Sequence, residues 1–217
     1  MEEKPRVDQE RLDMLRELAN IGIGSATTSL SEMLQDEKIM MDVPQVEVEV
    51  LQEVPEKLGD PENMVAGVYF EAQCPEEEIN LVLLFVLSME SVKNLIKRLL
   101  PDSSLEGYNF EAGEIGEMEL SMVREVGNIV AGSYLNALSF VTNLTFMSTP
   151  PQLAMDMTGA IVATVIAETR MVDDELILLK TEIHSAEEVL EGAIEGNVLI
   201  LPDEGAMVRI FNLMGVE

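Results

Sequence analysis

Residues 12–31 read LDMLRELANIGIGSATTSLS, and residues 120–139 read LSMVREVGNIVAGSYLNALS. Both stretches contain an aspartate or serine, a glutamate four positions later, and an asparagine three positions after that. The pattern consists of Asp13, Glu17 and Asn20 in the first copy, and of Ser121, Glu125 and Asn128 in the second. The copies lie 108 positions apart, which predicts a duplicated chain. We expect one domain over residues 1–217, made of two repeats at about 8–100 and 113–215.

Both stretches have the periodicity of a long helix. In the first, apolar residues recur three and four positions apart from Leu12 to Leu30, which is typical of a helix with one buried face. We predict helices over about residues 9–35 and 114–141. Positions i, i+4 and i+7 of a helix lie along one stripe. Each polar pattern therefore forms a row beside the apolar face, where a partner can reach it.

The segments between the two helices predict an antiparallel sheet. Residues 44–50 alternate between apolar and acidic, whereas residues 79–87 are almost continuously apolar, as expected of a central strand. Other extended segments are predicted at 64–70, 150–157, 175–183 and 197–201, and shorter helices at 53–58, 89–100, 159–168 and 204–214. Two or three strands are marginal alone, so the halves are expected to share one sheet. The predicted fold is α+β: a pseudo-two-fold α/β sandwich with about six strands and both signature helices on one face.

Composition narrows the range of partners. Lys and Arg total 13 against 41 Asp and Glu, so the formal net charge is −28, and phosphate-rich nucleic acids or anionic membranes would be repelled. Cys74 is the only cysteine, which excludes an intramolecular disulfide. The N-terminal residues have no apolar signal core, and no apolar run is long enough to span a bilayer. We therefore expect a cytoplasmic protein.

The polar rows have a plain interpretation and a functional one. In the plain one, Glu17 and Glu125 are solvated helix charges, and the asparagines are tolerated. However, an asparagine inside a helix competes for backbone hydrogen bonds, so its recurrence at one register indicates a function. Small residues surround it in each copy, either because another backbone approaches or because the helix lies tightly on the sheet. They include Gly22 and Gly24 in the first copy, and Gly127 and Gly132 in the second.

The sequence lacks the residues of a conventional hydrolase. It contains one histidine, no cysteine pair, and no pattern that indicates a nucleophile with its base. His184 follows a predicted strand and is expected to be structural. No calcium-loop spacing occurs, so we expect no intrinsic metal site.

At the polar rows the sequence resembles the CheC/CheX/FliY family of bacterial and archaeal chemotaxis phosphatases. The family signature is Asp or Ser, three residues, Glu, two residues, Asn, and a proline further along. Pro151 fits this proline in the second copy, whereas Pro44 stands one residue further from its asparagine in the first. Asp13 and Ser121 are expected to support the motif. Two signatures without an added switch domain resemble the CheC branch of this family.

The resemblance implies a hydrolase of two-component signalling that removes the phosphoryl group from the aspartyl phosphate of the regulator CheY. It implies that Asn20 and Asn128 orient the attacking water, and that Glu17 and Glu125 bond to the regulator's active-site Lys. The regulator supplies its own Mg²⁺, so no intrinsic cofactor is expected. The phosphatase would act mainly by positioning.

The resemblance also implies a function of another class. CheC-like proteins are known to bind the receptor deamidase CheD, so the alternative is a non-catalytic adaptor that regulates CheD. The contact is expected after Pro151, with Asp156 as the candidate residue, although Asp156 is equally well interpreted as a solvated strand residue. We expect a monomer whose partners are phosphorylated CheY and CheD.

Overall fold

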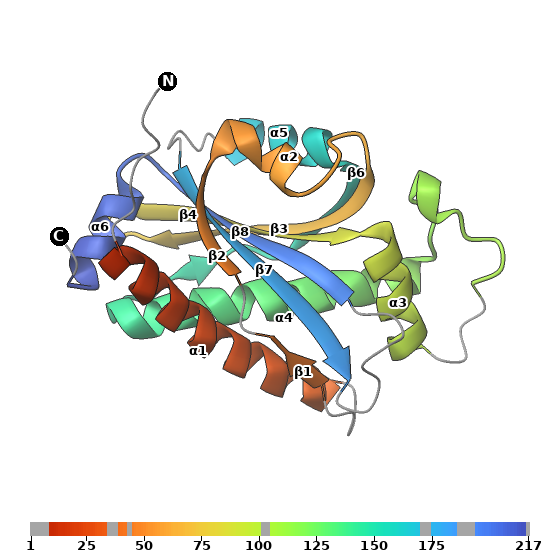
Figure 1. Ribbon diagram of the computed structural model, residues 1–217, viewed down its shortest axis with the longest axis horizontal. Helices are drawn as coiled ribbons and strands as arrows, with labels where there is room; N and C mark the ends of the chain where they lie inside the picture. The colour runs from red at the N-terminus through yellow and green to blue at the C-terminus, as the bar shows by residue number, and fades with distance from the viewer. Residues whose placement is uncertain are drawn as a thin grey trace.

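One antiparallel sheet lies between two layers of helices in the computed structural model (Figure 1). The structure describes residues 9–33, 39–42, 45–100, 105–169, 175–185 and 194–215. Its helices are α1 (Gln9–Met33), α2 (Val54–Lys57), α3 (Met89–Leu99), α4 (Glu117–Thr142), α5 (Thr158–Thr169) and α6 (Ala206–Leu213), with 3₁₀ turns at Leu51–Glu53 and Phe110–Ala112. The long helices α1 and α4 lie side by side on one face, α2 and α5 cover the other, and α3 and α6 lie at opposite ends. The predicted placement of both signature helices on one face is confirmed.

In the described part of the chain, the sheet contains the six predicted strands and two short ones that were not predicted. The strands are β1 (Ile39–Met41), β2 (Gln45–Val50), β3 (Met64–Cys74), β4 (Ile79–Ser88), β5 (Met147–Ser148), β6 (Gln152–Met157), β7 (Glu175–Ser185) and β8 (Ile194–Pro202). The order is β1-β7-β8-β4-β3-β5, with β2 also paired to β7 and β6 also paired to β3. β1 and β5 contain only three and two residues, which is too short for an alternation of apolar and polar residues to be recognised in the sequence.

The two halves exchange strands across the sheet. β2 of the first half pairs with β7 of the second, with Val46 opposite Leu179. β6 of the second half pairs with β3 of the first, with Leu153 opposite Val68. The central pair, β4 with β8, also joins the halves. Each half therefore supplies backbone hydrogen bonds to a hairpin of the other, and the sheet is shared as predicted.

The central strand β4 is buried on both faces. Leu83 and Phe85 belong to the core under α1 and α4, whereas Leu84 and Val86 belong to the smaller core under α2 and α5. This explains why its sequence is continuously apolar rather than alternating. Because α1 and α4 are packed on a buried sheet, the outward direction of their polar rows is determined by the core.

Local signals account for where two of the described helices, α3 and α4, begin. Ser88 caps α3 by accepting a hydrogen bond from the Ser91 backbone N–H at 3.1 Å. α4 begins at Glu117, three residues later than predicted, because Asn109 bridges to Glu114 and Gly113 adopts a left-handed φ of 70°. The predicted end of the first helix near residue 35, and Pro44, lie outside the described residues. Within the described ranges, none of the helices combines the length and apolarity of a membrane span.

Candidate functional site

The polar row on α1 is exposed along its whole length. Asp13, Glu17 and Asn20 are all exposed. Asp13 is engaged within its own helix, because its Oδ1 accepts hydrogen bonds from Gln9 Nε2 at 2.9 Å and from Arg16 Nη1 at 2.8 Å. In the described part of the chain, the side chains of Glu17 and Asn20 have no hydrogen-bond or ion-pair partner. A carboxylate and an amide are therefore available on adjacent turns.

The row on α4 differs in how far its asparagine is buried. Ser121 and Glu125 are exposed, as their counterparts on α1 are, but Asn128 is partly buried. None of these three side chains bonds to another described residue. The predicted residues thus form two separate sets, one on each helix, and each set offers an unpaired glutamate and an unpaired asparagine.

The glycines near the rows divide into two kinds. A Cβ added at Gly22 would lie 2.5 Å from Cδ1 of Tyr134, and one added at Gly127 would lie 2.5 Å from Cβ of Val68. Tight internal packing therefore explains these two. A Cβ at Gly24 or Gly132 would meet nothing within 4 Å, so internal packing does not explain them.

Tyr134 fills the space that Gly22 leaves between α1 and α4. Its side chain is fully buried. Burial raises the pKa of the Tyr134 hydroxyl well above its usual value. The tyrosine is thus a neutral spacer between the signature helices.

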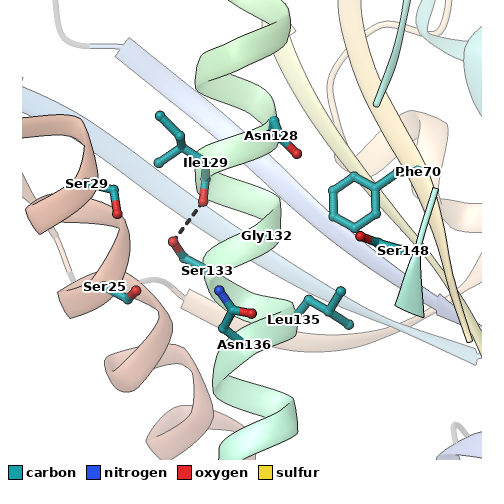
Figure 2. A pocket seen from close by; sticks show the side chains of 10 residues that line it. All are labelled: Ser25, Ser29, Phe70, Asn128, Ile129, Gly132, Ser133, Leu135, Asn136 and Ser148. Atoms are coloured by element: carbon teal, nitrogen blue, oxygen red, sulfur yellow. Dashed lines mark hydrogen bonds between the residues drawn. The ribbon is translucent and has the colours of Figure 1, made fainter. Parts of the chain in front are cut away.

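An open cavity of about 280 Å³ lies beside Asn128 (Figure 2). Ser25 and Ser29 approach it from α1, and Phe70 and Ser148 border it on the other side of α4. α4 itself contributes Asn128, Ile129, Gly132, Ser133, Leu135 and Asn136. The spacing of the polar rows does not predict this cavity. Its only sequence signal is the matched pair of small residues at Gly24-Ser25 and Gly132-Ser133.

Among the described residues, no group of three or more His, Cys, Asp or Glu side chains is arranged to hold a metal ion. The chemistry that each row offers is hydrogen bonding by an amide and charge pairing by a carboxylate.

Comparison with known proteins assigns both rows to one family. The CheC-like family matches residues 10–48 and 118–155, which contain the two rows in full. The chain is therefore similar to the CheC-like family over both of its rows. The CheY-P phosphatase CheC of Bacillus subtilis (strain 168) is 27% identical to this chain over 213 residues, which are 97% of each protein.

Solved structures share the fold of this chain. The crystal structure of FliY from Thermotoga maritima matches with a TM-score of 0.70 at 21% identity, over 97% of this chain and 98% of that one. A chain of the FliG–FliM complex from H. pylori matches with a TM-score of 0.64 at 15% identity, over 93% of this chain and all of that one. These likenesses establish the fold.

Asp156 lies apart from both CheC-like rows. It is exposed on β6, and its Oδ1 accepts a hydrogen bond from the Met157 backbone N–H at 2.8 Å. β6 pairs with β3 on one side only among the described strands. His184 lies on β7 opposite Met40 of β1, outside both rows.

Proposed function

We propose that this protein is a phosphatase of the chemotaxis response regulator CheY, acting on its aspartyl phosphate. The observation that carries the proposal is the pair of rows, each with an exposed glutamate and an asparagine that have no partner among the described residues. It is supported by 27% identity to a CheY-P phosphatase along 97% of the chain. We also propose a cytoplasmic location, where such a regulator would be met.

In this proposal the asparagines position the attacking water. The amides of Asn20 and Asn128 can donate one hydrogen bond and accept another, so they can hold a water in line with the breaking P–O bond. An amide brings no negative charge toward the phosphoryl group, which matters in a chain with a net charge of −28. We propose that the Mg²⁺ of the reaction belongs to the regulator and that this chain contributes orientation.

The glutamates determine the docked register. Glu17 and Glu125 have no ion pair within the described residues, so binding a lysine of the regulator breaks no existing contact. A charge-assisted bond to an ammonium group is shorter and stronger than a neutral one. Because each glutamate precedes its asparagine by three residues, one helix presents both groups to the same partner site.

The test is the rate at which phosphorylated CheY loses phosphate with and without the protein. Asn20→Ala combined with Asn128→Ala is expected to abolish the acceleration and leave the melting temperature unchanged or higher, since alanine favours a helix. Asn212→Ala on α6 is the matched control, because this asparagine is also exposed and helical but lies outside both rows. A double variant as active as the parent would refute the positioning role.

The adaptor alternative has one observation in its favour. Asp156 is exposed on β6, which has an unpaired outer edge among the described strands, and such edges can accept a partner. We propose that CheD, if it binds, contacts this strand. Asp156→Ala should then weaken CheD binding without changing phosphatase activity measured in the absence of CheD. If the protein binds CheD but shows no phosphatase activity with or without it, the adaptor is the better description.

A further inference from the structure

Gly24 and Gly132 are glycines that the protein's own packing does not require. They occupy equivalent positions inside α1 and α4, one turn after the asparagine of each row. Neither is among the described glycines with positive φ, and a Cβ at either position would meet no atom within 4 Å. Glycine weakens a helix relative to alanine because it loses more backbone freedom. The reason for glycine at both places therefore lies outside the free molecule.

The cavity beside Asn128 is a groove that crosses α4 at Gly132. Figure 2 shows Ser25 and Ser29 of α1 on one side of the helix and Ser148 of β5 on the other. Gly132 lies between these two borders, and since it has no side chain, the main chain of α4 forms the floor. A side chain at this position would divide the groove.

The lining of the groove contains no charged side chain, although one residue in four of the chain is charged. It combines serine and asparagine side chains with the apolar Phe70, Ile129 and Leu135. In the described structure the side chains of Ser25, Ser29, Asn136 and Ser148 have no hydrogen-bond partner. Their donors and acceptors complement the N–H and C=O groups of a peptide main chain. A phosphate or a metal ion would instead require charged groups in the lining.

We propose that the groove over Gly132 binds an uncharged main-chain segment of the phosphorylated regulator. This inference rests on the proposed phosphatase function, which it extends to how the regulator is recognised. Gly132 is one helical turn, about 6 Å, from Asn128, so the segment borders the phosphoryl group that Asn128 serves. A side chain at residue 132 would lift the regulator from α4 and withdraw the amide from the attacking water.

The test uses the full chain in an Asn20→Ala background, so that only the second row is active. Gly132→Ala and Gly132→Gln are compared with their parent by steady-state dephosphorylation and thermal unfolding. The alanine variant is expected to melt about 2–4 °C higher, because the Cβ meets nothing in the free protein. Its KM for the phosphorylated regulator is expected to rise about tenfold, because the added Cβ overpacks the interface with the regulator. The larger glutamine side chain should raise the KM further.

A binding measurement separates this inference from the phosphatase proposal. Regulator loaded with beryllofluoride, a phosphoryl mimic, is titrated with the same variants, and the two glycine substitutions should weaken binding in order of size. Val208→Ala on α6 is the control, since this exposed residue is helical and outside the groove. If the parent binds the beryllofluoride-loaded regulator but does not dephosphorylate the phosphorylated regulator, the proposed phosphatase function is wrong. The affinities of the Gly132 variants for the loaded regulator then still test the groove. Unchanged KM and affinity in both Gly132 variants would overturn the inference.

Discussion

Replacing Gly127 by alanine should destabilise the protein, although alanine is the better helix former. The new Cβ would lie 2.5 Å from Cβ, 2.6 Å from Cγ2 and 2.8 Å from Cγ1 of Val68. Val68 is fully buried on β3 and, being β-branched, has little freedom at χ1, so it cannot turn away. The clash involves the rigid base of a side chain rather than its flexible end.

The expected magnitude is the difference between two effects. Alanine gains about 1 kcal/mol of helix propensity. Overpacking a dense core costs about 1–3 kcal/mol of stability. Because the new Cβ would make three short contacts with Val68, we expect a cost at the upper end of this range. The net loss in the free energy of unfolding is therefore about 1–2 kcal/mol, which lowers the melting temperature by about 2–8 °C.

Urea and thermal unfolding measure this loss, and the phosphatase assay measures its effect on the adjacent Asn128. Gly132→Ala is the matched control, because it makes the same change five positions later on the same helix where no atom lies within 4 Å. The two variants should differ in sign. Val68→Ala removes the contacts to Cγ1 and Cγ2 but keeps the contact to Cβ, so it should relieve part of the clash and give a coupling energy of about 0.5–1.5 kcal/mol in a double-mutant cycle. A Gly127→Ala protein as stable as the parent, or sites that show no coupling, would refute the reasoning.

Two further outcomes are expected. Glu17→Lys combined with Glu125→Lys should raise the KM for phosphorylated CheY by about 100-fold, because an attraction to the regulator's lysine becomes a repulsion. Glu76→Lys combined with Glu77→Lys, in the exposed turn after β3, makes the same change in net charge and should have little effect on this KM. Equal effects of the two pairs would contradict the role assigned to Glu17 and Glu125. Burial raises the pKa of Tyr134, so the folded state keeps the hydroxyl proton at a pH where the unfolded state loses it, above about pH 10. The free energy of unfolding therefore falls as the pH rises past that value. The fall in unfolding free energy between about pH 8 and 11 should be smaller in Tyr134→Phe than in the parent, and identical slopes would show that Tyr134 does not contribute.

Periodicity predicted the long elements because it is local. The stripe Asp13, Glu17, Asn20 follows from helical geometry alone, and the continuously apolar residues 79–87 indicated a strand buried on both faces. β1 and β5 were not predicted, because a strand of two or three residues is stabilised by its pairing partner and not by its own pattern. The catalytic roles of the rows stay a prediction until the variants are measured.

That one polar row occurs twice, at the same register of two long helices, can be read from the amino-acid sequence, because the spacing of side chains on a helix depends only on positions along the chain. Which glycines serve packing and which lie open depends on the folded arrangement. Gly22 and Gly127 meet Tyr134 and Val68, which are distant in sequence, whereas Gly132 lies in a groove. That groove exists because the exchanged strands bring β5 to the edge of β3, beside α4 and opposite α1. Such contacts depend on how the elements pack, and no local pattern encodes them.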